Sequence, residues 1–201
     1  MITIIDYGMG NLRSAQKAFE FIGYEAEITD RLSDIQKAEK IVLPGVGAFA
    51  DAMDRLNTSG ISKVIKQKVA DGTPFLGICL GMQLVFDKSY ENGEFEGLGL
   101  IPGEVIRFDL PREYKVPQIG WNKLNIKDSR LFSDIKGDIY TYFVHSYYAQ
   151  PKDANDIIAT SNYGIEFTAA VNKKNVYATQ YHPEKSGTPG LKMLDNFAKL
   201  V

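Results

Sequence analysis

The chain has 201 residues, enough for one compact domain, and its 23 basic and 25 acidic side chains leave a net charge of −2. That balance excludes the broad positive surface of a dedicated nucleic-acid binder, and 44% hydrophobic residues exclude an intrinsically disordered chain. The single cysteine, Cys79, excludes an internal disulfide and, with only two histidines, a cysteine-rich zinc site. Without a signal-peptide pattern or an apolar run that could span a membrane, we expect a soluble, cytoplasmic protein.

The first 80 residues alternate short apolar runs with helical patterns. Three continuous apolar runs beside turn residues are expected to form strands: Ile2–Ile5, Ile41–Leu43 and Phe75–Ile78. Helices are expected after Asn11, which can cap one that ends before Gly23, and again through residues 61–69. Buried strands separated by amphipathic helices are typical of a doubly wound α/β fold with a mostly parallel sheet.

The second half of the chain carries a different pattern. Between Gly103 and Val176, short β-branched and aromatic runs alternate with turn residues, which predicts mostly strands, some of them antiparallel, that extend the same sheet. A final helix is predicted from one apolar stripe: Leu191, Leu194, Phe197, Ala198 and Val201. No repeat or linker divides the sequence, so we expect a single α/β domain over residues 1–201.

Cys79 lies in the segment Gly77-Ile78-Cys79-Leu80-Gly81, where a strand is expected to pass directly into a helix. Glycines two residues before and after it allow the sharp turn of a nucleophile elbow, here with sulfur in place of the hydroxyl oxygen. A helix N-terminus favours the thiolate, which is the reactive form. A lone cysteine is more often a buried structural residue, but the paired glycines at this strand-to-helix break favour a nucleophile.

A nucleophilic cysteine needs a base, and the chain has two histidines, His145 and His182. His182 follows an expected strand at 176–180, in the sequence YHPE. In extended chain, residues two apart face the same side, so Glu184 can orient the His182 ring. Alone, this pair could be a solvated strand end. Together with the elbow it predicts a triad of Cys79, His182 and Glu184.

The third requirement of acyl transfer is a pair of donors for the oxyanion. The Pro44-Gly45-Val46-Gly47 turn follows a neighbouring strand of the same parallel sheet, so we expect it at the same carboxyl edge as Cys79. Its backbone can supply one N–H, and Leu80, the residue after the nucleophile, can supply the other. By itself the turn could be an ordinary loop.

Three motifs resemble the triad family of glutamine amidotransferases: GICLGMQ at 77–83, PGVG at 44–47 and YHPEKS at 181–186. Three more are similar to the glutaminase subunits of imidazole glycerol phosphate synthase: DYGMGN at 6–11, GWN at 120–122 and YFVHSY at 142–147. The resemblance spans nearly the whole chain. It implies a flavodoxin-like amidotransferase fold and hydrolysis of L-glutamine through a glutamyl thioester on Cys79, with His182 protonating the departing ammonia.

The resemblance also implies roles outside the triad. Val46 and Leu80 would form the oxyanion hole, Val46 only after its turn reorients. Glutamine would be bound by four residues, partly through their backbone groups: Gly47, Gln83, Ser146 and Tyr147. The resemblance implies neither a cofactor nor a metal ion.

A partner follows from the same resemblance. The ammonia would pass to a cyclase, a (β/α)8 barrel, which uses it to make imidazole glycerol phosphate and an aminoimidazole carboxamide ribotide in histidine biosynthesis. Four positions match those that face this partner: Asn11, Trp121, Tyr142 and Lys185. Alone, these residues could be a helix cap, a core aromatic, a strand aromatic and a solvated lysine, respectively. The family usually has histidine at the position of Gln118. This difference leaves open the details of the interface and which cyclase the glutaminase serves.

Three other functions stay open. The same glutaminase could serve another synthase, including one in a sugar-modification pathway, although the motifs at 117–122 and 142–147 argue against this. A stand-alone cysteine peptidase or hydrolase would normally have its base closer to the elbow and no histidine at a strand end. A non-catalytic binding module would not be expected to keep Cys79, His182 and Glu184 together.

Overall fold

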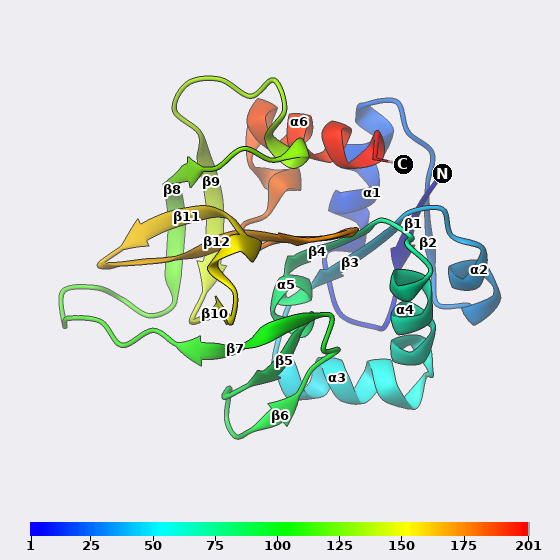
Figure 1. Cartoon of the computed structure of the whole chain (residues 1–201), viewed down its shortest axis with the longest axis horizontal. Coiled ribbons are helices and arrows are strands. Elements are labelled where there is room, and N and C mark those ends of the chain that lie inside the picture. Colours follow the sequence, from blue (N-terminus) through cyan, green and yellow to red (C-terminus); the bar gives the residue numbers. More distant parts are fainter. Residues whose placement is uncertain (201) are drawn as a thin grey trace.

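A nine-stranded sheet forms the centre of the molecule, which a computed structural model describes for residues 1–200 (Figure 1). Five neighbouring strands run parallel: β2 (Ala26–Thr29), β1 (Ile2–Ile5), β3 (Ile41–Gly45), β4 (Phe75–Cys79) and β13 (Val176–Thr179). Four antiparallel strands continue the sheet beyond β13: β12 (Ile165–Lys173), β11 (Ile157–Tyr163), β8 (Gln118–Ile126) and β9 (Tyr140–His145). The predicted α/β class and the change from parallel to antiparallel strands are confirmed.

A second, four-stranded sheet is a departure from the expectation that all later strands extend one sheet. Its strands, in order, are β10 (Tyr147–Pro151), β7 (Ile101–Arg107), β5 (Phe86–Ser89) and β6 (Phe95–Glu96). Backbone hydrogen bonds from Leu98 to Leu84 and from Ile101 to Val85 hold this sheet against the chain that follows Cys79. The periodicity of a strand shows which side chains are buried but not which strand it pairs with, so the sequence pattern could not separate the two sheets.

Helices cover both faces of the central sheet, as a doubly wound fold requires (Figure 1). One face carries α1 (Leu12–Phe21) and α6 (Gly187–Ala198). The other carries the small sheet and four helices: α2 (Leu32–Lys37), α3 (Phe49–Thr58), α4 (Ile61–Ala70) and α5 (Leu80–Leu84). Three 3-10 turns complete the fold: η1 (Arg130–Phe132), η2 (Ala154–Asp156) and η3 (Pro183–Lys185). Each face has its own apolar core.

Local signals in the first strand and helix are confirmed. The strand Ile2–Ile5 has the predicted bounds, and the Asn11 side chain accepts a hydrogen bond from the backbone N–H of Ser14 (3.4 Å) at the start of α1. Gly23 follows that helix with φ +91°, a conformation that favours glycine. The predicted C-terminal stripe lies on α6, except that Val201 is outside the described residues.

The strand order brings distant sequence motifs to one edge. Because β4 lies between β3 and β13, and all three run parallel, their carboxyl ends are neighbours. Gly45 is the register partner of Cys79 across β3 and β4. The antiparallel end of the sheet curls back to this edge, since the backbone N–H of His182 donates to the carbonyl of Tyr142 on β9 (3.0 Å).

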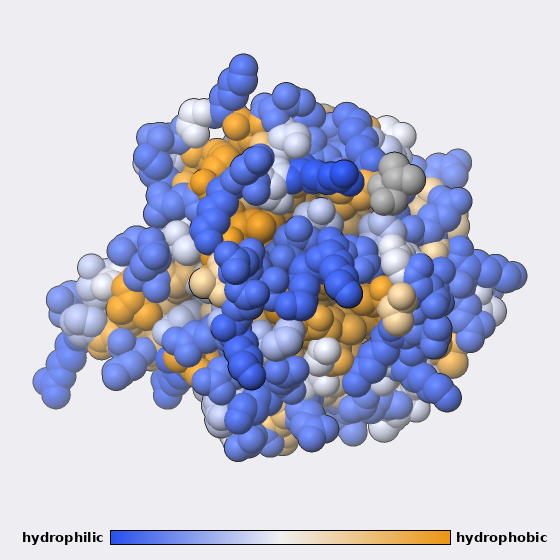
Figure 2. Space-filling view, in the orientation of Figure 1, coloured by the Kyte–Doolittle hydropathy of each residue, from blue (hydrophilic) through white to orange (hydrophobic). Residues whose placement is uncertain are grey.

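No helix among residues 1–200 is long and apolar enough to cross a bilayer. The face shown in Figure 2 is mostly hydrophilic and is interrupted by apolar patches. Apolar atoms contribute more than half of an ordinary folded surface, so these patches by themselves identify no binding site.

Candidate active site

Cys79 sits at a sharp junction between β4 and α5. Its backbone has φ 57° and ψ −110°, an unusual conformation for a residue with a side chain. A Cβ on Gly77 would lie 2.5 Å from the carbonyl oxygen of Gly81, and one on Gly81 would collide with the carbonyl oxygen of Leu43. The two glycines therefore permit the close approach of β3, β4 and α5 that forms the elbow.

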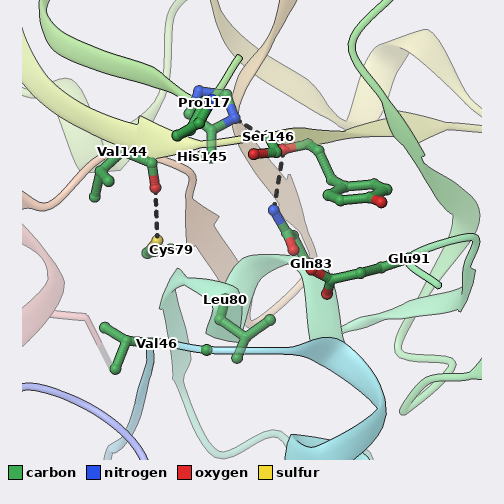
Figure 3. A pocket seen from close by; sticks show the side chains of 11 residues that line it. Val46, Cys79, Leu80, Gln83, Glu91, Pro117, Val144, His145 and Ser146 are labelled. Carbon is green, nitrogen blue, oxygen red and sulfur yellow. Dashed lines mark hydrogen bonds between the residues drawn. The ribbon is translucent and has the colours of Figure 1, made fainter.

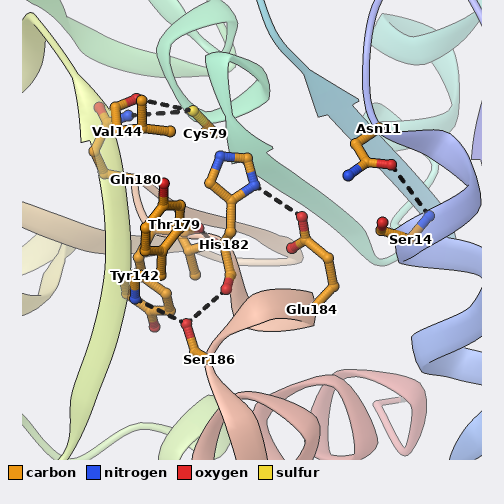
Figure 4. A network of polar contacts seen from close by, with 11 residues as sticks. Asn11, Ser14, Cys79, Tyr142, Val144, Thr179, Gln180, His182, Glu184 and Ser186 are labelled. Atoms are coloured by element: carbon orange, nitrogen blue, oxygen red, sulfur yellow. Dashed lines mark hydrogen bonds and ion pairs between the residues drawn. The ribbon is translucent and has the colours of Figure 1, made fainter. Parts of the chain in front are cut away.

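His182 and Glu184 form a buried pair beside this elbow. Nδ1 of His182 lies 2.8 Å from Oε1 of Glu184, and Nε2 of His182 has no hydrogen-bond partner in the described chain. Figure 4 shows the imidazole ring between Glu184 and Cys79. The two residues meet through the 3-10 turn η3, not through the extended chain that we expected. Pro183 begins this turn, where its missing N–H removes no hydrogen bond.

Electrostatics favour a charged ring at His182. Burial lowers the pKa of His182, but its interactions with Cys79 and Glu184 outweigh burial and raise this pKa to about 10. The sulfur itself lies 3.9 Å from the carbonyl oxygen of Val144 and 3.9 Å from Nε2 of Gln180. A thiol between these groups and a buried, positively charged imidazole is an arrangement suited to nucleophilic attack.

The Pro44-Gly45-Val46-Gly47 turn lies directly across from the elbow. A Cβ on Gly45 would be 2.9 Å from Cβ of Leu80 and 3.1 Å from the backbone nitrogen of Gly81, so the turn and the start of α5 touch. Gly47 has φ +102°, and Val46 is 44% exposed. The two backbone segments expected to donate to an oxyanion therefore border the same space.

A cavity of about 310 Å³ opens beside Cys79 (Figure 3). Its walls come from the turn after β3, the elbow, and the segment that joins β9 to β10. The lining residues are Val46, Gly47, Cys79, Leu80, Gln83, Glu91, Pro117, Val144, His145, Ser146 and Tyr147. They include all the residues that the resemblance implies for the oxyanion hole and for substrate binding. A cavity of this size accommodates a small molecule.

Gln83 connects the elbow helix to the far wall of this cavity. Its Nε2 donates to the carbonyl of Tyr147 (3.0 Å) and to Oε1 of Gln180 (3.1 Å). The Gln83 side chain is buried, so these bonds hold it in one orientation while Tyr147 and Ser146 form the opposite wall.

Comparison with known proteins decides the family to which this site belongs. A family model described as glutamine amidotransferase class-I matches residues 3–201. The chain belongs to the class-I glutamine amidotransferases. The subunit HisH of imidazole glycerol phosphate synthase from Rhodopirellula baltica is 50% identical over 198 residues, which cover 98% of this chain and 97% of that one. The HisH subunit from Geobacter metallireducens is 52% identical over 203 residues, with the same coverage of both chains.

Solved structures of lower identity share the fold of this amidotransferase. A crystal structure of a glutamine amidotransferase has a TM-score of 0.77 at 18% identity and covers 98% of this chain and all of the other. PurLQS from Thermotoga maritima has a TM-score of 0.75 at 20% identity, with 98% and 96% coverage. At these identities the similarity supports the architecture alone.

Glu91 is a pocket residue of this amidotransferase that sequence reasoning missed. It is the acidic side chain among the lining residues, and its Oε2 accepts a hydrogen bond from the backbone N–H of Phe49 (2.7 Å) at the start of α3. It lies between β5 and β6, in a segment without a recognisable motif. Only the packing of the small sheet against α3 brings it to the cavity, so no local signal could have revealed it.

Three of the four residues expected to face a partner gather on one side of the amidotransferase. Trp121 on β8 and Tyr142 on β9 are register partners with ring centroids 6.1 Å apart, and Nζ of Lys185 lies 5.9 Å from the Tyr142 ring. Trp121 is 55% exposed, contrary to its alternative interpretation as a core aromatic. Asn11 caps α1, a helix that contacts the 3-10 turn η3 to which Lys185 belongs. No group of three or more His, Cys, Asp or Glu residues within 1–200 could hold a metal ion.

Proposed function

We propose that this amidotransferase is the glutaminase subunit of imidazole glycerol phosphate synthase. In this function, residues 1–201 form a single amidotransferase domain in the cytoplasm and a heterodimer with a (β/α)8-barrel cyclase. The observation that carries the proposal is the elbow cysteine beside a buried His182–Glu184 pair, in a chain about 50% identical to HisH subunits over nearly its whole length. The amidotransferase hydrolyses L-glutamine, and the cyclase consumes the ammonia in histidine biosynthesis.

Cys79, His182 and Glu184 would perform the hydrolysis in two steps. The thiolate of Cys79 attacks the side-chain amide carbon of glutamine, and His182 delivers a proton from Nε2 to the departing ammonia. A glutamyl thioester remains on the sulfur. Water attacks this thioester, His182 accepts the water's proton, and the Cys79 thiolate leaves as glutamate is released. Glu184 keeps the ring oriented and stabilises its charge without reacting itself.

Backbone N–H groups of Val46 and Leu80 would stabilise the oxyanion in both steps. Gly47, Gln83, Ser146 and Tyr147 would hold the glutamine, because they line the cavity next to the sulfur. We add Glu91 to this set. Its carboxylate is the group in the cavity wall that can pair with the α-ammonium of an amino acid.

The partner cyclase would dock on the exposed side of β8 and β9. Trp121, Tyr142 and Lys185 form a continuous group there, and Ile119 on β8 is 63% exposed. Aromatic side chains that are exposed in one subunit are typical of the centre of an interface. Asn11, which lies across Glu184 from Tyr142 (Figure 4), would contact the partner at the start of α1.

Copurification with the cyclase and a glutamine-dependent assay test this function. The complex should form imidazole glycerol phosphate from glutamine and the cyclase substrate, with one glutamate released for each product. Glutamate release without formation of that product would favour a glutaminase for another synthase. Hydrolysis of peptides or esters by the isolated chain would favour a stand-alone cysteine hydrolase.

A further inference from the structure

Two buried polar side chains face each other behind the cavity, outside the triad. Gln118 on β8 is 1% exposed and His145 on β9 is 6% exposed, and they are register partners in an antiparallel pair. Directly opposite side chains in such a pair lie on the same face within contact distance. Both side-chain amide atoms of Gln118, and Nε2 of His145, have no hydrogen-bond partner among the described residues, so the two side chains are opposite each other but not bonded in this arrangement.

The chemistry of His145 determines which partner its free nitrogen requires. Nδ1 lies 2.8 Å from the carbonyl oxygen of Tyr147, and because a carbonyl only accepts, Nδ1 carries the hydrogen. Burial lowers the pKa of His145 to about 4, so its ring is neutral near pH 7. In this tautomer Nε2 is an acceptor that needs a donor, and the Gln118 amide provides an N–H on the same face.

We propose that Gln118 is a positioning residue whose amide, after a rotation of its side chain, donates to Nε2 of His145 and thereby fixes the glutamine-binding wall. The inference deepens the proposed function and rests on it. Gln118 does not touch the substrate. It acts through the ring of His145, whose other nitrogen holds the Tyr147 carbonyl.

The carbonyl of Tyr147 connects the Gln118–His145 pair to the wall of the glutamine-binding cavity. The same oxygen accepts from Nε2 of Gln83, so His145 and Gln83 hold it from two sides (Figure 3). Gln83 is bound in turn to Gln180, whose Nε2 lies 3.9 Å from the Cys79 sulfur. A loss of orientation at His145 would therefore move the Ser146–Tyr147 backbone and loosen the residues that face the nucleophile.

Aromatic side chains surround the His145 ring. Ring centroids of Phe108, Phe143 and Phe167 lie 5.1, 5.6 and 5.2 Å from that of His145. These rings offer no donor to Nε2. The Gln118 amide, on the adjacent strand, is the polar group that the sheet register places opposite it.

Substitution of Gln118 in the complex with the cyclase tests the effect on catalysis. Gln118→Met keeps the length of the side chain and removes the donor, and we expect the KM for glutamine to rise roughly three- to tenfold, with a smaller change in kcat. Gln118→His restores an N–H donor and should return KM towards the wild-type value. Thr141→Val is the matched control, because Thr141 is also buried on β9 with an unpartnered hydroxyl but lies outside the cavity wall. It should leave KM unchanged.

Nitrogen NMR of the full chain tests the pairing independently of glutamine hydrolysis. His145 and His182 are the two histidines of the sequence, so their ring signals can be assigned by comparison with His182→Asn. We expect His145 to be neutral with hydrogen on Nδ1, and its Nε2 to resonate at the upfield position of a hydrogen-bonded acceptor. In Gln118→Met this signal should move downfield.

The two measurements separate failure of this inference from failure of the proposed function. An active wild-type complex whose KM is unchanged by Gln118→Met would overturn the positioning role and leave the proposed function intact. A wild-type Nε2 signal typical of a free nitrogen would overturn the pairing, even where the substituted chain fails to fold. A wild-type complex without glutaminase activity would overturn the proposed function, and the NMR spectrum alone would then decide the pairing.

Discussion

Nδ1 of His182 lies 2.8 Å from Oε1 of Glu184, in a pair whose side chains are each only 3% exposed. Burial lowers the pKa of His182, but Cys79 and Glu184 outweigh it and hold this pKa at about 10. In the unfolded chain the pKa of a histidine is about 6.5. The charged ring therefore stabilises the fold fully below about pH 6.5, and this stabilisation is lost as the pH rises towards about 10.

Glu184→Gln removes the carboxylate charge and should lower the pKa of His182. We expect the free energy of unfolding to fall relative to wild type, most strongly near pH 6, with a difference that narrows as the pH rises towards the folded pKa. Urea unfolding of both proteins at a series of pH values measures this. A difference that does not vary with pH would show that Glu184 stabilises the fold by packing and not by charge. Glutamine hydrolysis should survive better than in His182→Asn, because Glu184 does not react.

Cys79→Ser should abolish glutamine hydrolysis and leave the fold intact. The hydroxyl is far less acidic than the thiol, and its volume is similar, so the nucleophile is lost with little change in packing. Glutamate release and the midpoint of thermal unfolding measure the two expectations. A serine variant with full activity would contradict the thioester mechanism.

His182→Asn separates the chemistry of the amidotransferase from the function of its partner. We expect glutamine-dependent turnover of the complex to be lost, while turnover with added ammonium persists, because ammonium bypasses the glutaminase site. Both rates come from one assay of the cyclase product. If ammonium-dependent turnover is also lost, His182 has a structural role in the complex.

Gly81→Ala tests whether the elbow depends on close backbone approach. A Cβ at this position collides with the carbonyl oxygen of Leu43, so we expect a loss of stability of more than about 2 kcal/mol together with loss of activity. Gly72→Ala is the control. A Cβ at position 72 would meet nothing within 4 Å. This substitution should therefore lower the free energy of unfolding by only about 1–2 kcal/mol, which is the strain of an L-residue at positive φ, and it should leave the site active.

The elbow and the triad could be predicted because their physical requirements leave a signature at fixed spacing. Gly77 and Gly81 must lack side chains on either side of Cys79, and Pro183 lies between the two residues of the acid–base pair. The same reasoning was wrong about local geometry, since His182 and Glu184 meet through a 3-10 turn. A short turn and a strand end can both bring residues two apart together, and the sequence does not distinguish them.

What could not be predicted depends on contacts between distant segments. Glu91 reaches the cavity only because the small sheet packs on α3, and Gln118 faces His145 only because of the register between β8 and β9. Sequence periodicity indicates that a side chain is buried but not which side chain it faces. Glu91 therefore became visible only in the folded chain, and so did the position of Gln118 opposite His145.

The oxyanion turn supplies the last prediction, which concerns coupling to the partner. Free hydrolysis would waste glutamine and release ammonia into water, where it is protonated and not nucleophilic. Gly47 has φ +102°, which favours glycine, and the neighbouring Val46 is 44% exposed. The peptide bond between Val46 and Gly47 can therefore rotate when a partner binds beside it. Without the backbone N–H of Val46 as a donor to the oxyanion, the rate of glutamine hydrolysis should fall by about 10²–10³-fold. We therefore expect the isolated chain to hydrolyse glutamine at least about a hundredfold more slowly than the complex with ligand bound to the cyclase.

Gly47→Val tests this turn directly. A β-branched residue strongly disfavours positive φ, so the rotation should be hindered and the activated rate should fall far more than the basal rate. Gly72→Val is the matched control, since Gly72 also has positive φ (+89°) but lies in the loop after α4, and it should leave the ratio of the two rates unchanged. Steady-state glutamate release with and without the liganded cyclase measures both ratios. If the isolated wild-type chain already works at the rate of the complex, the turn is formed without the partner, and its Val46 N–H is a permanent part of the oxyanion hole.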